Sequence, residues 1–262
     1  MKRIVLLSST VFIVSFAMAQ KQPADSTSKK SAIINPVPAP TVKPKKKDWS
    51  KINLTNRAND HFLIQIGYDN WLQTPDSIHI KGFSRSLNMY LMYDFPFKTD
   101  PRFSVGVGVG IGSSSIFFDK QEVTVNTLSN GLGFPDESQS NHFKKYKLVS
   151  TYAEVPVELR YVADPEHNSK SWKAAVGVKI GTLLDVHTKG KILQSSSGAT
   201  INDYVEKISS KRFFNTTRLA GTARIGYGHI SIFGQIQINN FIKSGQGPTV
   251  TPFSTGITFS GL

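Results

Sequence analysis

The stretch Phe103-Ser-Val-Gly-Val-Gly-Val-Gly-Ile-Gly112 decides the fold class of this chain of 262 residues. A large apolar residue occupies every second position, and glycine or serine lies between them. Successive side chains of a β-strand point to opposite faces, so this period of two predicts a strand with one apolar and one small face. The glycines match no nucleotide-binding motif. We interpret them as relieving crowding inside a narrow barrel.

The same period recurs along the rest of the chain. It begins at His61, where Phe62, Ile64, Ile66 and Tyr68 alternate with Leu63, Gln65, Gly67 and Asp69, and it returns over 83–95. Five further segments of this kind follow, at about 146–161, 172–186, 213–227, 229–240 and 252–260. The pattern predicts an all-β fold, an eight-stranded antiparallel up-and-down transmembrane β-barrel.

The connections between these strands alternate in length. The short ones are 96–101, 162–171 and the turn at Gly228, and the long ones are 70–82, 120–145, 187–212 and 241–251. Outer-membrane barrels have short periplasmic turns and longer external loops. With the N-terminus in the periplasm, every long connection falls outside the cell.

The apolar face must look outward. A soluble lipocalin-like barrel would turn this face inward, but the interior of eight strands holds only its side chains or one small ligand. The apolar face carries too many large residues for that space. The other face carries Gly, Ser, Thr and charges, which suit a crowded polar lumen.

Aromatic residues on the apolar face gather near the two ends of the strands, as in the two aromatic girdles of membrane barrels. One group falls at the periplasmic strand ends: Phe62, Phe95, Phe103, Tyr161, Trp172, Tyr227 and Phe259. The other falls at the external ends: Tyr68, Phe83, Phe117, Phe213 and Phe253.

Charged and amide side chains occupy the alternate strand positions that point into the barrel, which we call the inward parity, because a charge facing lipid is costly. We expect them to form a hydrogen-bonded lumen network of Asp94, Glu154, Glu158, Arg160, Lys173, Lys179, Asp185, Arg218, Arg224, Gln235 and Gln237. Arg85 has outward parity but lies near the external rim. Pro156 removes a ladder donor, so we expect a local bulge or gap there.

The first sixty residues have a different composition. Residues 1–19 read as a signal peptide: Lys2 and Arg3 precede an apolar run, and Ala17-Met-Ala19 precedes the predicted cleavage site. Residues 20–60 are rich in Lys, Pro, Ser and Thr and predict a disordered periplasmic tether. Residues 61–262 form the barrel domain. Residues 1–51 hold ten Lys/Arg and two Asp, so most of the net charge of +13 lies there, and we expect no nucleic-acid partner.

The segment Thr151-Tyr-Ala-Glu-Val-Pro-Val-Glu-Leu-Arg-Tyr161 resembles a strand motif of small outer-membrane β-barrel proteins of Bacteroidota, the PorT-like family. That motif commonly reads Tyr-Leu-Glu-Ile-Pro, and Ala153 replaces its Leu. The glycine-rich strand and Arg224-Ile-Gly-Tyr-Gly228 are similar too. The resemblance covers roughly 60–262 and implies fold and outer-membrane localisation. Most members of the family have no assigned role, so it implies no secretion function.

Residues that could carry chemistry are few. The chain has no cysteine, and its six histidines show no metal-ligand spacing, so we expect no catalytic site, metal or cofactor. Asp185 and His187 share one face at the external end of a strand, where a hydrolase or acyltransferase dyad is an alternative to an ordinary rim pair. Loop-base cations are candidates for lipopolysaccharide phosphates or for simple solvation: Lys144, Lys145, Lys147, Lys189, Lys191, Lys207, Lys211 and Arg212.

Three functions follow as hypotheses. The first is a non-enzymatic outer-membrane barrel with a filled lumen that acts through its external loops in binding, adhesion or envelope stability, with the lipid bilayer and lipopolysaccharide as partners. The second is an accessory subunit of an outer-membrane, secretion-type assembly that holds a periplasmic or outer-membrane protein through residues 20–60. The third is a rim hydrolase or acyltransferase. A channel is not expected, because side chains should plug the lumen.

Overall fold

The computed structural model describes residues 61–126 and 131–260. The predicted signal peptide (1–19) and tether (20–60) lie outside the described residues. Among the residues described, no helix has the length and apolar character needed to cross a bilayer.

The described chain is almost entirely strand. Its elements are β1 (Phe62–Leu72), β2 (Arg85–Pro96), β3 (Phe103–Phe118), β4 (His142–Val162), the 3-10 turn η2 (Asn168–Lys170), β5 (Trp172–Gln194), β6 (Thr200–Ser209), β7 (Thr217–Tyr227), β8 (Ile230–Gln237) and β9 (Thr251–Ser260).

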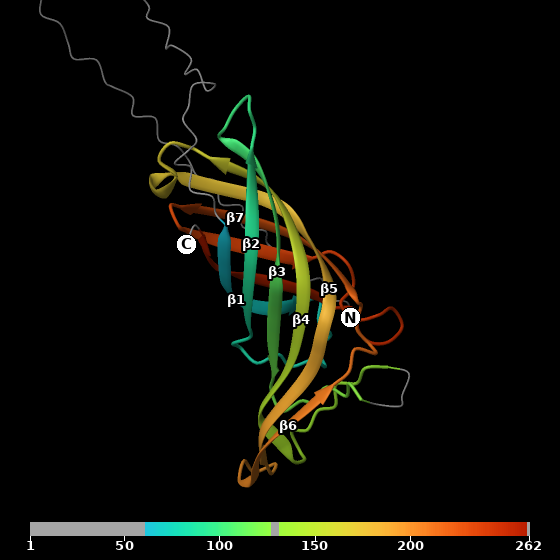
Figure 1. Cartoon of the computed structure of the whole chain (residues 1–262). Coiled ribbons are helices and arrows are strands. Elements are labelled where there is room, and N and C mark those ends of the chain that lie inside the picture. Colours follow the sequence, from blue (N-terminus) through green and yellow to red (C-terminus); the bar gives the residue numbers. More distant parts are fainter. Residues whose placement is uncertain (1–60, 127–130, 261–262) are drawn as a thin grey trace, which may run out of the picture. The chain divides into compact units, whose positions relative to one another are not determined.

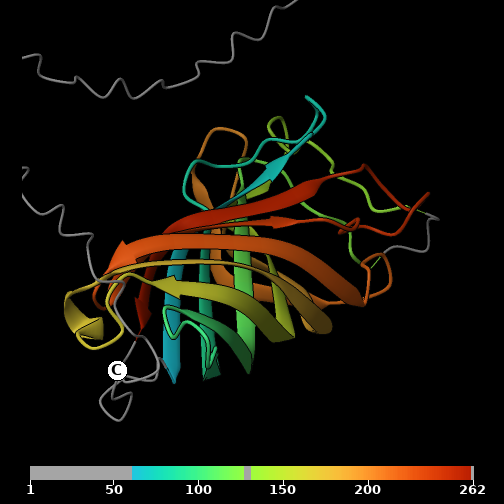
Figure 2. The same cartoon turned by 90° about the horizontal axis from the view of Figure 1, so that it is seen from above.

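Eight of these strands close into a ring. They lie in the order β4-β3-β2-β1-β9-β8-β7-β5, all neighbours are antiparallel, and pairing of β4 with β5 closes the circle. The predicted eight-stranded antiparallel barrel is confirmed (Figures 1 and 2). We call the side of the short connections 97–102, 163–171 and 228–229 the turn side, and the opposite side the loop side.

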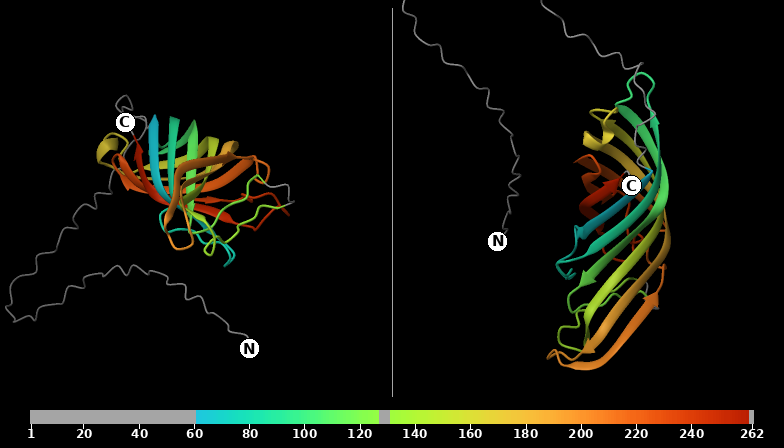
Figure 3. Two further views of the ribbon diagram at one scale, coloured as in Figure 1. Left: turned by 90° about the horizontal axis from the view of Figure 1, so that it is seen from below. Right: turned by 60° about the vertical axis from the view of Figure 1, so that its left-hand side comes forward.

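The ninth strand, β6, was not predicted. Residues 187–212 were expected to form a long loop, and this was wrong: β5 continues to Gln194, and β6 returns along it from Thr200 to Ser209. Within residues 61–126 and 131–260, β6 pairs with β5 alone, beyond the ring on the loop side (Figures 1 and 3). The error arose because strand outside the bilayer needs no apolar face, so its alternation disappears although its backbone is still paired.

β4 and β5 are far longer than a bilayer requires. They contain 21 and 23 residues, whereas a tilted membrane strand needs only about 9–11. At about 3.4 Å per residue, both strands extend well past the hydrocarbon region. Together with β6 they form a sheet that stands above the barrel mouth.

Burial follows the predicted parity. In β2 the residues from Ser84 to Met92 alternate without exception, with Phe83, Leu87, Met89 and Leu91 exposed. Exposed outward side chains of the other strands include Val109, Ile225 and Ile232, which are 57%, 60% and 64% exposed. A soluble monomer rarely exposes a continuous apolar surface of this extent. The outward face is therefore a lipid-facing surface.

Two local irregularities adjust the ring. The β3–β4 ladder is interrupted opposite Pro156, between Val107↔Val157 and Gly110↔Glu154, so the expected gap is confirmed. The β4–β5 register shifts between Thr151↔Asp185 and Tyr152↔Leu183, which leaves Leu184 as an extra residue. This bulge reverses the inward parity of β5 beyond Leu183.

The glycines of β3 make room for side chains of the lumen. A Cβ atom on Gly106 would lie 2.4 Å from Arg160 Nε, and one on Gly110 would lie 2.5 Å from Tyr90 Cδ1. Both distances are shorter than a normal van der Waals contact. The glycines on the inward face of β3 therefore leave the space that the side chains of Arg160 and Tyr90 occupy in the lumen.

Candidate functional site

The turn-side third of the lumen holds a buried cluster of ions. Glu158 accepts hydrogen bonds from Arg160 Nε at 3.0 Å and from Arg224 Nη2 at 3.1 Å. Arg160 also forms an ion pair with Asp94 at 3.6 Å. Alternating acidic and basic groups from β2, β4 and β7 therefore neutralise each other across the barrel axis.

The middle of the lumen is a second network. Glu154 accepts hydrogen bonds from Tyr90 Oη at 2.5 Å and Arg218 Nη1 at 2.9 Å. Lys179 donates to Tyr90 Oη at 3.0 Å, and also to Gln65 Oε1 at 2.9 Å and Gln235 Oε1 at 2.7 Å. The three donor bonds saturate the Lys179 ammonium group.

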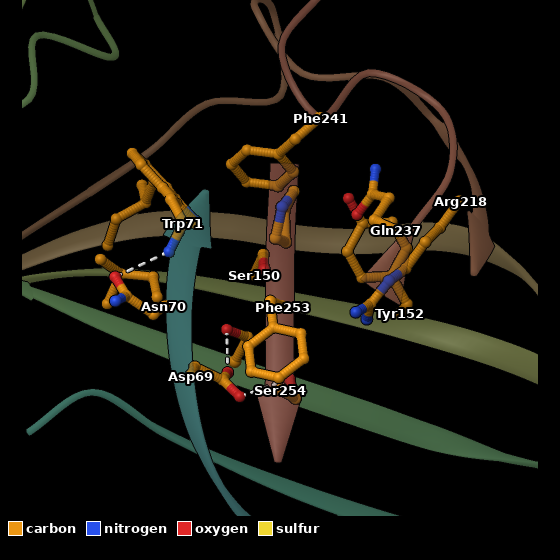
Figure 4. A pocket seen from close by; sticks show the side chains of 14 residues that line it. Asp69, Asn70, Trp71, Ser150, Tyr152, Arg218, Gln237, Phe241, Phe253 and Ser254 are labelled. Atoms are coloured by element: carbon orange, nitrogen blue, oxygen red, sulfur yellow. Dashed lines mark hydrogen bonds between the residues drawn. The ribbon is translucent and has the colours of Figure 1, made fainter. Parts of the chain in front are cut away.

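Above this network, on the loop side, lies a small cavity. Asp69 accepts hydrogen bonds from Ser254 at 2.5 Å and from Ser114, and these residues line one wall (Figure 4). The cavity has a volume of about 10 Å³, which is close to one water molecule. Tyr152 Oη and Gln237 Nε2 border it and have no hydrogen-bond partner among the described residues.

A hydrophobic cluster covers the cavity on the loop side. Its members come from strand extensions and from the connections β1–β2, β3–β4, β6–β7 and β8–β9. We call it the cap, and it comprises Trp71, Ile78, Ile116, Phe118, Val123, Val125, Leu132, Phe143, Tyr146, Leu148, Tyr152, Leu183, Val186, Phe213, Phe214, Phe241, Ile242 and Val250. The connections are thus packed over the mouth of the barrel.

The predicted lumen residues are placed largely as expected. The structure buries these inside the ring: Asp94, Glu154, Glu158, Arg160, Lys173, Lys179, Arg218, Arg224, Gln235 and Gln237. Asp185 was assigned wrongly: its side chain is 40% exposed, because the extra residue Leu184 turns it to the outer face. Tyr90, Gln65 and Asp69 were missed, although their inward parity was visible in the alternation.

The aromatic residues form two outward rings, with one exception. On the turn side the outward residues, exposed or partly exposed, are Phe62, Phe95, Phe103, Tyr161, Trp172, Tyr227 and Phe259. On the loop side they are Tyr68, Phe83, Phe117 and Phe253. Phe213 was assigned wrongly: it is fully buried in the cap. β7 begins only at Thr217, so strand parity does not extend back to this residue.

Asp185 and His187 do meet on the outer face. His187 Nδ1 lies 2.7 Å from Asp185 Oδ2, which is the arrangement that orients an imidazole for proton transfer. Across the ladders His187 faces Val149 and Ser209. The described residues include no hydrogen bond from a hydroxyl to this imidazole.

Several of the predicted loop-base cations gather on one outward face. Lys145 and Lys147 of β4 and Lys189 and Lys191 of β5 surround a hollow of about 250 Å³, together with Arg85 of β2 and the ring of Phe117. We call these five cations the basic patch. The remaining predicted cations do not line the hollow: Lys144, Lys207, Lys211 and Arg212.

Comparison with known proteins agrees with this geometry. The family model described as outer membrane protein beta-barrel domain matches residues 52–243. No curated protein matches the chain. The match spans most of the chain, and the structure provides the closed ring, the lipid-facing exterior and the filled polar lumen. The protein belongs to the outer membrane protein beta-barrel domain family.

Proposed function

We propose that this protein is a non-enzymatic outer-membrane barrel with a side-chain-filled lumen that acts through its external part in binding, adhesion or envelope stability. The observation that supports this best is the combination of a filled lumen with a packed cap. The cavity below the cap has a volume of about 10 Å³, and buried side chains of the two networks occupy the axis beneath it. The cap itself buries eighteen hydrophobic residues on the loop side.

The lumen network argues against solute passage through the barrel. Opening a path would separate Glu154 from Arg218 and Glu158 from Arg224, and each of these pairs is buried. Breaking one buried pair costs about 3–5 kcal/mol. The ring is therefore better suited to anchor the external part than to conduct.

The external part has the rigidity that a binding scaffold needs. β4, β5 and β6 continue as a paired sheet past the ring, and the connections pack into the cap. Binding residues are frequently presented by loops on such a scaffold. On β6, Ile201 and Val205 are 52% and 51% exposed, and no described strand pairs with the second edge of β6. The tip of the β5–β6 hairpin is thus the part most available to a partner.

A hairpin-trimmed variant tests this proposal. Lys191 and Val205 face each other across the hairpin, so Ile192–Tyr204 can be replaced by an Asn-Gly turn that keeps the register and every cation of the basic patch. In a strain that lacks the protein, the full chain should restore resistance of the envelope to detergent, and the trimmed chain should not. Equal complementation would contradict the proposal, as would ion conductance of the full chain in planar bilayers.

A finer family assignment is also part of the proposal. We infer PorT-like, Bacteroidota-type membership from the resemblance of Thr151–Tyr161. We further propose export by residues 1–19 and a periplasmic position for residues 20–60, which places the loop side outside the cell. The alternative role as an accessory subunit of an assembly depends on this tether. Deleting 20–60 should then remove a co-purifying partner, and an unchanged set of partners would dismiss that role.

A further inference from the structure

The structure points to a lipid-binding site: we propose that the basic patch binds the phosphate groups of a phosphorylated glycolipid of the lipid A class in the external leaflet. This inference rests on the proposed function, since it requires the loop side to face outward, and it names a partner for the envelope role.

The first observation is the position of the patch on the barrel. Lys145 and Lys147 occupy the outward positions of β4. Further along β4, the same alternate positions lead through the partly exposed Thr151 and Ala153 to the exposed Val155. Lys147 is paired with Phe117 of the loop-side aromatic ring in the β3–β4 ladder. Aromatic rings of this kind mark the membrane interface, so Lys147 lies where the acyl chains of a lipid end and its headgroup begins.

The second observation is that like charges face each other directly. Lys145 is paired with Lys191 and Lys147 with Lys189 in the β4–β5 ladder. On the other side of β5, Lys189 is paired with Lys207. Like charges at directly opposed positions destabilise a sheet. Two adjacent pairs of this kind, next to a third lysine, indicate that a bound anion supplies the compensating charge.

The third observation is the lack of internal acids. Elsewhere on the loop side the chain does pair a lysine, since Lys81 Nζ lies 3.0 Å from Asp119. In the described parts, 61–126 and 131–260, no salt bridge joins a carboxylate to any cation of the basic patch.

The fourth observation is the form of the hollow. Its volume of about 250 Å³ is bounded by the basic patch and by Phe117. Arg85 Cζ and Lys147 Nζ lie 5.4 Å and 5.5 Å from the centre of the Phe117 ring. Phe117 belongs to the loop-side aromatic ring, so the hollow joins an apolar contact to five positive charges. Charged groups above an apolar surface suit an amphipathic lipid better than a free anion.

The test uses the folded full-length mature chain in detergent. The patch variant carries Lys145→Gln, Lys147→Gln, Lys189→Gln and Lys191→Gln. The control variant removes the same number of charges elsewhere on the loop side, through Lys120→Gln, Lys144→Gln, Lys211→Gln and Lys243→Gln. Removing the opposed lysines relieves repulsion, so the patch variant should fold. If the fourfold patch variant does not fold, the double variant Lys147→Gln with Lys189→Gln is used in its place.

Binding is measured by native mass spectrometry with bisphosphorylated lipid A, with dephosphorylated lipid A and with inorganic phosphate as competitor. We expect the patch variant to bind bisphosphorylated lipid A at least about tenfold more weakly than the wild type and the control variant, because several charge-assisted contacts are lost. Dephosphorylated lipid A should bind the wild type as weakly as the patch variant binds the bisphosphorylated form.

Three results would overturn the inference: equal binding by the patch variant, equal binding of both lipids by the wild type, or displacement of lipid by millimolar inorganic phosphate. The last result would identify a site for a soluble anion. Complementation by the patch variant keeps this outcome separate from the proposed function. If the patch variant no longer binds lipid A but still restores detergent resistance, lipid A binding is not needed for the envelope role, and the proposed function stands. The hairpin-trimmed variant tests the proposed function independently.

Discussion

Glu154 is the residue whose loss should disturb the lumen most. It accepts hydrogen bonds from Tyr90 and from the buried guanidinium of Arg218. Glu154→Gln keeps the shape and one acceptor oxygen but removes the negative charge. Arg218, 6% exposed, then lies in the lumen without its counter-charge. Breaking a buried ion pair in this way costs about 3–5 kcal/mol, so we expect the free energy of unfolding to fall by that amount.

The assay is equilibrium unfolding by guanidinium in lipid vesicles, followed by tryptophan fluorescence and by the gel mobility of folded barrels. The matched control is the double variant Glu154→Gln with Arg218→Met, which removes both charges. It should recover much of the loss, because no buried charge is then left without its counter-charge. A loss below about 1 kcal/mol, or a double variant no better than the single one, would refute the account of a mutually neutralised lumen.

The other predictions concern single groups around the lumen, the cap and the rim. Tyr90→Phe should lower the free energy of unfolding by about 2 kcal/mol because it removes bonds to Glu154 and Lys179, whereas Tyr152→Phe should cost almost nothing in the same assay, since its hydroxyl has no partner. Phe213→Ala should lower the local stability of the cap by about 3–5 kcal/mol, seen as faster hydrogen exchange in the loop-side connections while the ring stays protected; uniform protection would contradict this. Burial and the nearby carboxylates Glu137 and Glu206 raise the pKa of Glu122 above its ordinary value of 4.5, so ionisation opposes folding there: cap protection should decrease as pH rises from below 4.5 through the raised pKa, and Glu122→Gln should remove that dependence. His187→Ala should leave phospholipid and peptide turnover by the purified protein at background level, and activity that vanishes in the variant would support the rim-enzyme alternative.

Sequence alternation was sufficient to predict the ring and which face of each of its strands points outward. In the membrane each outward position faces lipid and each inward position faces the crowded axis. The position of a residue in the alternation therefore predicts that Met89 is exposed on the outer face and that Glu154 is buried. The gap opposite Pro156 was predictable for a similar reason, because a proline cannot donate to the ladder.

Parity failed where that environment ends. The bulge at Leu184 inverts β5, and no local feature of the sequence marks it, so Asp185 was placed on the wrong face. Beyond the bilayer, β6 is held by pairing with β5 and has no buried apolar side chain. The cap was missed because its members, such as Phe213 and Val123, are single apolar residues scattered over several connections. Their contact depends on tertiary packing.

The central claim is that the apolar side chains of the barrel face lipid while the polar ones fill its axis. The chain contains no cysteine, so single cysteines with a fluorescent label report individual positions without background. Labels at Val107→Cys, Val157→Cys and Ile257→Cys in reconstituted vesicles should be quenched by brominated acyl chains and not by aqueous iodide, while Thr222→Cys should be protected from the lipid quencher. Quenching by iodide at the three outward positions, or a folded protein that stays in solution without lipid or detergent, would contradict the account.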